Sequence, residues 1–245
     1  MTLGDRLFAA PIDGEPSKIL DVGTGTGIWA IDMADTYPLA EVVGTDISPI
    51  QPTWVPPNCF FRVEDAQLEW TYPADNFDFV HIRALLGCID DWPRLYRQVH
   101  TALKPGGWFE HYEFTVTLYS DVPEVRDDPN HIFKRWSKAA MEAADRIGKT
   151  MRIGVGDQLS QLMHEAGFVN VVQKHYHVPS GAWSSDAKLK TIGAYNLAFL
   201  DASLEGFMLF LLREVMGWEY EKIQLFLMEM RKAIRNPKIR PYYVL

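Results

Sequence analysis

The first half of the chain alternates short apolar runs with segments of helical period. Residues 28–36 place Ile28, Ile31 and Ala34 on one face, which predicts a helix over Ile28–Thr36. Strands that alternate with helices indicate an α/β fold with a parallel sheet. The apolar runs that we assign to its first four strands are Lys18–Val22, Glu41–Asp46, Cys59–Val63 and Phe77–Ile82.

A second helix and a fifth strand follow. The helix begins at Asp90-Asp91-Trp92-Pro93, where an acid supplies the N-cap and a proline occupies the first turn. The turn Leu103–Gly107 ends it and leads into a fifth strand, Trp108–Leu118. The apolar positions that keep the helical period are Trp92, Leu95, Tyr96, Val99 and Leu103.

The second half of the chain has mainly helical periodicity. We place a sixth strand at Val169–Val178 and a seventh at Ile239–Leu245, with about 60 residues between them. The helix from Leu204 is apolar on most sides, which fits a buried core, a substrate wall or a dimer contact. The expected helices lie at Ile132–Ile147, Val155–Ala166, Ala187–Asp201, Leu204–Met216 and Tyr220–Arg235.

Three glycines at alternate positions separate the first strand from its helix. Gly23, Gly25 and Gly27 allow a sharp turn and leave room for a ligand, and the following helix N-terminus offers free N–H groups. The dinucleotide fingerprint requires glycine where Ile28 stands, and no Gly-Lys-Ser/Thr of a P-loop follows. We therefore expect a small, partly anionic ligand of another kind.

The glycine spacing, preceded by an acid, resembles motif I of class I methyltransferases that use S-adenosylmethionine (SAM). A second acid, Asp46, ends the next strand about 20 residues on, where a ribose-binding acid is expected. The LKPGG turn at residues 103–107 is typical of the same class. The resemblance implies that Asp21 lies near the methionine ammonium, that Asp46 binds two ribose hydroxyls, and that Asp65 accepts the adenine amino group. The full set of cofactor-binding residues that we predict is Asp21, Gly23, Thr24, Gly25, Gly27, Asp46, Ile47, Asp65, Ala66 and His81.

This resemblance also implies the architecture. We predict an α/β, Rossmann-like fold in which a seven-stranded, mostly parallel sheet forms a single methyltransferase domain over residues 1–245. In the common fold the last two strands form a hairpin. The 60 residues that intervene here indicate an inserted helical cap over the strand ends, with segments at about 119–150 and 183–235.

The loop after the second strand is unusual. Residues 48–57 contain four prolines, which remove backbone donors and block a helix, so we expect an extended loop in place of the usual second helix. Trp54 in this loop either lines a pocket or packs against the edge of the sheet.

Four stretches narrow the resemblance to the fungal LaeA-like methyltransferases, over about residues 8–240. That family includes regulators of secondary metabolism and pathway enzymes that methylate small molecules. It therefore implies the fold and SAM, but not the substrate. The stretches that carry the resemblance are Asp21–Asp32, Ser48–Pro57, Asp91–Pro93 and Glu110–Glu113.

Charge and cysteine content restrict the partners. A net charge of −8 argues against a broad phosphate-binding surface, so we expect no nucleic-acid partner. Cys59 and Cys88 are the only cysteines, which suits a reducing compartment and provides no metal-site spacing. No apolar run approaches 18 residues, so we expect no membrane partner and a protein of the cytoplasm or the nucleus. The basic cluster at residues 231–240 fits a solvated helix end or a localisation signal.

Three side chains are candidates for catalysis. Methyl transfer from a sulfonium needs mainly in-line positioning, and it needs a general base only when the acceptor is a neutral hydroxyl or a similar group. His81 and His111 end strands on the expected face and are candidate bases, with a structural role or a cofactor contact as the alternative. Arg83 would instead hold a substrate carboxylate, which is ionised already and needs no base. His175 and His177 lack a third ligand, so we predict no metal site.

The leading hypothesis is O-methylation of a small molecule, at a hydroxyl or a carboxylate, in fungal secondary metabolism. The alternative is a SAM-binding regulator that acts through a protein partner. A homodimer is compatible with both. A closed aromatic pocket would favour the enzyme, and a large exposed apolar patch would favour the regulator.

Overall fold

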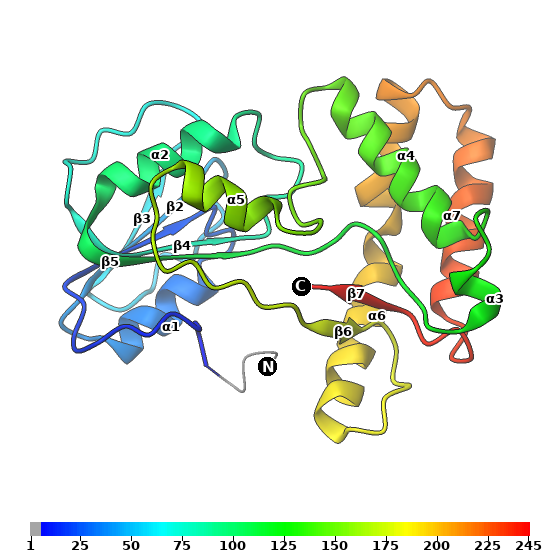
Figure 1. The fold of residues 1–245 in the computed structure, drawn as a ribbon, viewed down its shortest axis with the longest axis horizontal. Helices are drawn as coiled ribbons and strands as arrows, with labels where there is room; N and C mark the ends of the chain where they lie inside the picture. Colours follow the sequence, from blue (N-terminus) through cyan, green and yellow to red (C-terminus); the bar gives the residue numbers. More distant parts are fainter. Residues whose placement is uncertain (1–5) are drawn as a thin grey trace. The chain divides into compact units, whose positions relative to one another are not determined.

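The computed structural model describes residues 6–245, which fall into two compact units. The first, here called the sheet unit, comprises residues 6–113 and 156–173 (Figure 1). The second, the helical unit, comprises residues 114–155 and 174–245. We describe each unit by itself. The prediction that residues 1–245 form a single domain stays a prediction.

The sheet unit is built on five parallel strands in the order β3-β2-β1-β4-β5. Its first three strands have the predicted bounds. Strands β1 and β2 bury most of their residues in the sheet interior, whereas β3 is an edge strand that buries only Cys59. The chain runs outward from β1 in one direction and then returns to the other side through β4, so the order reverses between β1 and β4. The strands are β1 (Lys18–Val22), β2 (Glu41–Asp46), β3 (Cys59–Val63), β4 (Phe77–Arg83) and β5 (Leu103–Tyr112).

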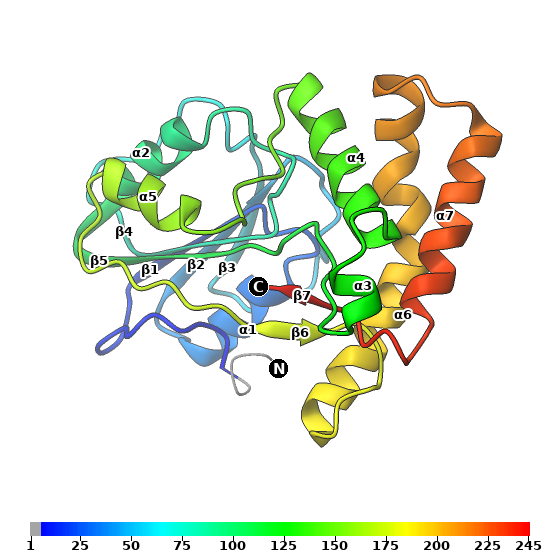
Figure 2. The same cartoon turned by 45° about the vertical axis from the view of Figure 1, so that its right-hand side comes forward.

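Helices cover both faces of this sheet, as Figures 1 and 2 show. Helix α1 (Ile28–Thr36) buries Trp29 against Phe79 of β4. On the opposite face α2 (Trp92–Ala102) packs Tyr96 against Phe109 of β5. Helix α5 (Gln158–Glu165) lies beside α2. The predicted cap of α2 is confirmed, because the Asp91 side chain accepts from the Arg94 N–H.

The predicted seven-stranded sheet is wrong in its strand number. Strand β6 (His177–Pro179) pairs antiparallel with β7 (Tyr242–Val244) in a separate two-stranded sheet of the helical unit. The predicted start of β6 is wrong: Val169 and Val172 are 78% and 74% exposed, so this run is not buried against a core. Asn170 also adopts a left-handed conformation, with φ of 55°, which interrupts an extended strand.

Strand β5 also differs from its prediction. It starts at Leu103, inside the LKPGG turn, and ends at Tyr112. The next residues leave the five-stranded sheet and pair with β7 instead, through Thr115 N–H to Val244 O at 2.8 Å and a bridge between Tyr119 and Tyr242. The predicted long fifth strand is therefore shared between two sheets.

The helical unit has a core of its own. Helices α4 (Ile132–Arg146) and α7 (Tyr220–Ile234) lie where helices are predicted, and the short helix α3 (Pro123–Arg126) was not predicted as a separate element. Two predicted helices form one continuous element, α6 (Ala187–Phe210) followed by the π-helical turn η1 (Leu211–Val215), because Ala202 and Ser203 between them do not stop a helix. The core residues of this unit include Phe133, Trp136, Leu204, Met208, Leu212, Ile223 and Leu227.

One described helix, Ala187–Val215, is long and apolar enough to cross a membrane by length and composition, with a mean hydropathy of 1.3 over 18 residues. Core helices of soluble proteins pass the same test. Leu204, Met208 and Leu212 of this helix are almost fully buried in the helical unit. Only 22% of the apolar window is buried, so the helix packs a narrow face into the unit, and one such helix is weak evidence for a membrane span.

Candidate functional site

The glycine loop lies at the carboxyl end of β1, where the strand order reverses. Ligands of open parallel sheets bind at this position. Gly23, Gly25 and Gly27 all have left-handed φ values, of 70°, 59° and 80°. A Cβ on Gly23 would lie 2.5 Å from Cδ2 of Leu85, and one on Gly27 would lie 2.3 Å from the ring of Phe61. A Cβ on Gly25 would meet nothing within 4 Å, so the loop is open on that side.

Asp21 lies buried beneath this loop and is 3% exposed. Its Oδ2 accepts from the Thr24 hydroxyl at 2.6 Å, and its Oδ1 lies 2.8 Å from Nδ1 of His81. The His81 ring in turn stacks on Trp29, with centroids 3.8 Å apart and planes within 8°. Asp21 therefore joins the glycine loop to β4 and α1, and His81 is a buried partner of Asp21.

Asp46 holds the other side of the glycine loop. Its Oδ2 accepts from the Gly25 N–H at 2.8 Å, and its Oδ1 accepts from the Ser48 N–H at 2.9 Å. The carboxylate is half-buried, and the next residue, Ile47, is 70% exposed. Trp54 is 94% exposed, so both alternatives for it are wrong: the proline-rich loop holds it in solvent.

Asp65 and Ala66 follow β3 at the same edge of the sheet. Asp65 is half-buried, and its Oδ1 accepts from the Gln67 N–H at 2.9 Å. Ala66 O accepts from Nε1 of Trp70 at 3.1 Å. The Glu64 N–H donates to Asp46 O at 3.0 Å, which links the ends of β2 and β3. Acids at the ends of neighbouring strands therefore lie on one side of the glycine loop.

His111 lies on the opposite face of the sheet from His81. Its Nδ1 lies 2.6 Å from the Tyr96 hydroxyl, and its ring stacks on Trp92 with centroids 5.2 Å apart. Its Nε2 is 3.4 Å from Oε2 of Glu113, a contact without the alignment of a hydrogen bond. Both the His111 and the Glu113 side chains are fully buried. Burial, with the Glu113 charge adding to it, raises the pKa of Tyr96 well above its usual range.

Arg83 is the one predicted catalytic side chain that is exposed. It is the last residue of β4, two positions beyond His81. Its guanidinium forms no hydrogen bond or ion pair with any residue between 6 and 245. The structure therefore leaves one free cation at the carboxyl end of β4, beside two buried and partnered histidines.

The sequence did not reveal several residues that shape this edge. Ala84 has a φ of 57°, a strained conformation for a residue with a side chain, and Leu85 after it contacts Gly23. The Leu85 N–H donates to Oε2 of Glu113 at 3.0 Å. Glu113 lies in one of the stretches that carry the family resemblance, so the sequence could have indicated its importance. No sequence pattern indicates that Ala84 adopts a left-handed conformation.

Cys59 provides no nucleophile. Burial raises the pKa of its thiol to about 11, and the Asp21 charge adds to that shift. The thiol is therefore protonated near neutral pH. Among the described residues, no group of three or more His, Cys, Asp or Glu side chains could hold a metal ion.

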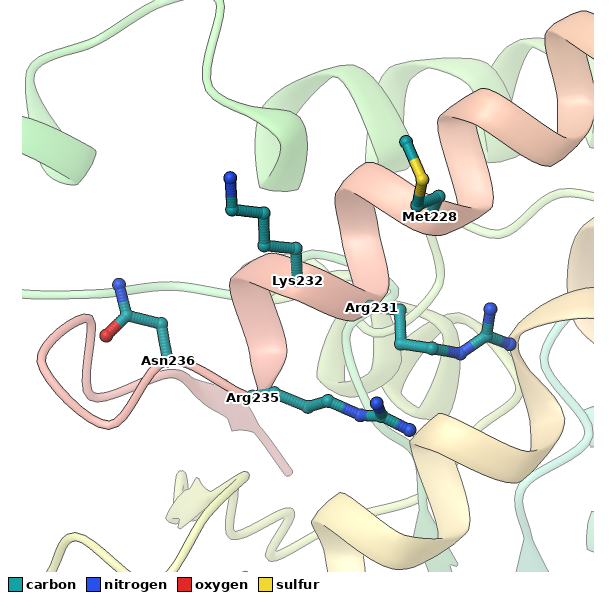
Figure 3. Close-up of a pocket in the computed structure, with 5 residues that line it drawn as sticks. All are labelled: Met228, Arg231, Lys232, Arg235 and Asn236. Carbon is teal, nitrogen blue, oxygen red and sulfur yellow. The ribbon is translucent and has the colours of Figure 1, made fainter.

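Figure 3 shows a pocket in the helical unit, at the C-terminal end of α7. Two of its basic residues share one carboxylate, because Arg231 and Arg235 both pair with Asp201, at 3.2 Å and 2.5 Å. This is the arrangement of a solvated helix end. The lining residues are Met228, Arg231, Lys232, Arg235 and Asn236.

A family model described as a methyltransferase domain matches residues 3–173. The chain belongs to this methyltransferase family. It is a methyltransferase that uses SAM, and it falls among fungal methyltransferases and regulators of secondary metabolism. The match covers the whole sheet unit and thus every predicted site residue.

Three curated relatives illustrate the range of the family. Methyltransferase pytC of Aspergillus terreus is 38% identical over 236 residues, which are 96% of this chain and 71% of pytC. Secondary metabolism regulator LAE1 of Cochliobolus heterostrophus is 37% identical over 97% of this chain and 78% of its own. The probable methyltransferase tdiE of Emericella nidulans is 30% identical over 99% and 75%.

Solved structures support the fold. Phosphoethanolamine N-methyltransferase 2 of Haemonchus contortus, solved with SAM, matches with a TM-score of 0.53 and 16% identity, over 94% of this chain and 47% of that one. A protein of Galdieria sulphuraria, described as a putative sarcosine dimethylglycine methyltransferase, matches with a TM-score of 0.51 and 14% identity, over 95% and 78%. At these identities the likeness concerns the fold alone.

Proposed function

We propose that this chain transfers the methyl group of SAM to an oxygen of a small molecule, and that a carboxylate is the favoured acceptor. The observation that supports the carboxylate is the free, exposed Arg83 at the carboxyl end of β4, on the same strand as the buried His81. A guanidinium binds a carboxylate through two parallel hydrogen bonds.

The residues around the glycine loop fit the cofactor. Gly25 presents an open backbone face, and the half-buried acids Asp46 and Asp65 flank it from the ends of β2 and β3. In this proposal Asp46 faces the ribose hydroxyls and Asp65 faces the adenine. Asp21 lies on the methionine side, where its negative charge favours an ammonium group.

The cofactor supplies a methyl group on a sulfonium that leaves as a neutral thioether. The chain's own task is then to position the acceptor and exclude water. A carboxylate is ionised at neutral pH and needs no base. This suits a site whose two histidines are 2% and 0% exposed in their side chains and already have partners.

The test is a methylation assay with labelled SAM on matched aromatic carboxylic acids and phenols. A methyl ester releases methanol in mild alkali, whereas an aryl methyl ether does not. We expect alkali-labile product, and we expect Arg83→Met to lower kcat/KM about tenfold or more, with Arg83→Lys less affected. Product stable to alkali, or full activity in Arg83→Met, would reject the carboxylate acceptor.

A second candidate function is regulation through a protein partner. Its support is three exposed apolar side chains in or next to the proline-rich loop, Ile47, Ile50 and Trp54, which are 70%, 60% and 94% exposed, together with relatives named as regulators. Complementation of a fungal strain that lacks a LaeA-type regulator would separate the two functions. Rescue by wild type but not by Trp54→Ala, with SAM binding intact in that variant, would favour the regulator. On either proposal we place the protein in the cytoplasm or the nucleus.

A further inference from the structure

The proline-rich loop reaches back to the glycine loop through a single side chain, Gln51. Its Nε2 donates to Gly25 O at 2.6 Å and to Ser48 O at 2.9 Å. A side-chain amide nitrogen carries two hydrogens, so both are used on these two carbonyl groups. Gln51 is half-buried, although its neighbour Ile50 is 60% exposed.

Gly25 is consequently held on both sides. The carboxylate of Asp46 accepts its N–H at 2.8 Å, and the amide of Gln51 donates to its C=O. No atom outside its chain neighbours lies within 4 Å of the position of a Cβ on Gly25, so packing does not restrain this residue. A glycine with a left-handed φ of 59° and no packing would otherwise be free to adopt many conformations.

We propose that Gln51 is a positioning residue of the cofactor site, which keeps the Gly25 peptide in the orientation that binds SAM. This inference rests on the proposed placement of SAM at the glycine loop. Together, Gln51 and Asp46 make the end of β2 and the glycine loop one rigid element before the cofactor arrives. Such preorganisation increases affinity because less conformational entropy is lost on binding.

The residue type and its setting suit this role. Pro49 and Pro52 flank Gln51 and restrict the backbone of the loop, and the Ile50 N–H donates to Ser48 O at 3.0 Å. A glutamate here would place a carboxylate against two carbonyl oxygens. A methionine would match the length of the side chain but donate nothing.

The test compares Gln51→Met and Gln51→Glu with wild type by two readouts. The first is hydrogen exchange of peptides that cover residues 23–27 in the ligand-free protein, and the second is calorimetric titration with SAM and S-adenosylhomocysteine. We expect faster exchange in both variants. For Gln51→Met we expect about tenfold weaker binding of both ligands, as the loss of one or two hydrogen bonds implies.

Lowering the pH should restore part of the SAM affinity of Gln51→Glu, because a protonated carboxyl can donate a hydrogen bond. At pH 8 its carboxylate cannot donate, so we expect weaker binding than in Gln51→Met. At about pH 4.3, the ordinary pKa of a glutamate side chain, about half of the carboxyl groups are protonated and regain one donor. The affinity of Gln51→Glu relative to wild type at the same pH should therefore recover in part, whereas that of Gln51→Met should not. The Asp46 carboxylate accepts the N–H of the same residue, Gly25, and wild type titrated at both pH values corrects for any effect of pH on that contact.

Asn58 offers a matched control. Its Nδ2 carries two hydrogens and lies within 3.1 Å of three backbone carbonyl oxygens, of Ala34, Tyr37 and Ala40, at the far end of α1 from the glycine loop. Asn58→Leu removes a comparable amide clamp and should lower Tm while leaving the SAM Kd within about twofold.

The variant Asp46→Ala distinguishes failure of the proposed SAM site from failure of the proposed role of Gln51. If Asp46→Ala binds SAM as wild type does, the proposed cofactor site itself is wrong. If Asp46→Ala loses binding while Gln51→Met keeps wild-type affinity and wild-type exchange, the cofactor site stands and the role of Gln51 is overturned. The same holds if Asn58→Leu weakens SAM binding as much as Gln51→Met does.

Discussion

Two histidines at the same edge of the sheet have different surroundings. His81 pairs in register with Asp21 on β1, whereas His111 pairs with Ile82, the next residue of β4. Because successive residues of a strand point to opposite faces, this offset of one residue places His81 under α1 and His111 under α2. One contacts the Asp21 carboxylate directly, and the other contacts the Tyr96 hydroxyl.

The two faces reach the glycine loop by routes of different length. On the α1 face His81 contacts Asp21, and Asp21 binds Thr24 within the loop. On the α2 face His111 lies near Glu113, Glu113 accepts the Leu85 N–H, and the Leu85 side chain contacts the loop at Gly23. We infer that both histidines are positioning residues, and that changes on the α1 face affect the cofactor site more strongly.

The largest effect is expected for Asp21→Ala. This change leaves His81 and Thr24 without their buried acceptor, and breaking such a buried pair costs about 3 kcal/mol of unfolding free energy. SAM affinity should fall about 100-fold, since the loop and the acid are lost together. Urea denaturation and calorimetry measure both effects. Near-wild-type SAM affinity in a folded variant would show that Asp21 does not serve the cofactor.

The paired variants His81→Phe and His111→Phe test the comparison directly. Phenylalanine keeps a ring for stacking on Trp29 or Trp92 but removes the hydrogen bond. His81→Phe leaves a buried carboxylate oxygen unpaired and should cost about 2 kcal/mol, whereas His111→Phe orphans a neutral hydroxyl and should cost about 1 kcal/mol. SAM affinity should follow the same order. If His111→Phe lost more stability in urea unfolding, or more SAM affinity in titration, than His81→Phe, the inference that the α1 face affects the cofactor site more strongly would be contradicted.

Alkaline unfolding isolates the α2 face. The pKa of Tyr96 is raised in the folded protein, so the unfolded state loses this proton first as the pH rises through about 10. The stabilisation is therefore complete below pH 10 and declines above it. Tyr96→Phe lacks this group, so its urea midpoint should fall less between pH 9 and 11 than that of wild type. If the urea midpoint fell equally with pH in wild type and in Tyr96→Phe, burial would not raise the pKa of Tyr96. Since burial also raises the pKa of Tyr72, only the difference between the two proteins is informative.

The smallest effect is expected for Thr24→Val. Valine keeps the shape of the side chain and removes only the 2.6 Å hydrogen bond to Asp21, so we expect a loss of about 1 kcal/mol in unfolding free energy. SAM affinity should fall no more than about threefold, because His81 still holds Asp21. Thermal denaturation and titration provide the measurement. A loss as large as that of Asp21→Ala would mean that Thr24, and not Asp21, dominates the loop.

Much of the sheet unit could be predicted because its signals are local. The runs that became β1, β2 and β3 are short and apolar, and their bounds match the structure. The glycine spacing predicts a sharp turn, and all three glycines have the left-handed φ values that such a turn needs. Asp21, Asp46 and Asp65 were placed at strand ends by their distance from these runs, and the structure brings them to one edge of the sheet.

The sequence by itself therefore determined the α/β class, the strands nearest the glycine loop, the methyltransferase family and the acids at the strand ends. Each follows from residue type and spacing within short stretches of the chain. Only the tertiary structure decided that β6 and β7 leave the main sheet, that α6 runs unbroken from Ala187, and that Gln51 holds Gly25. The tertiary structure also decided which residues His81 and His111 contact. Strand register and the helix packed on each face determine the partners of a side chain, and register and packing both arise from contacts between residues distant in the chain.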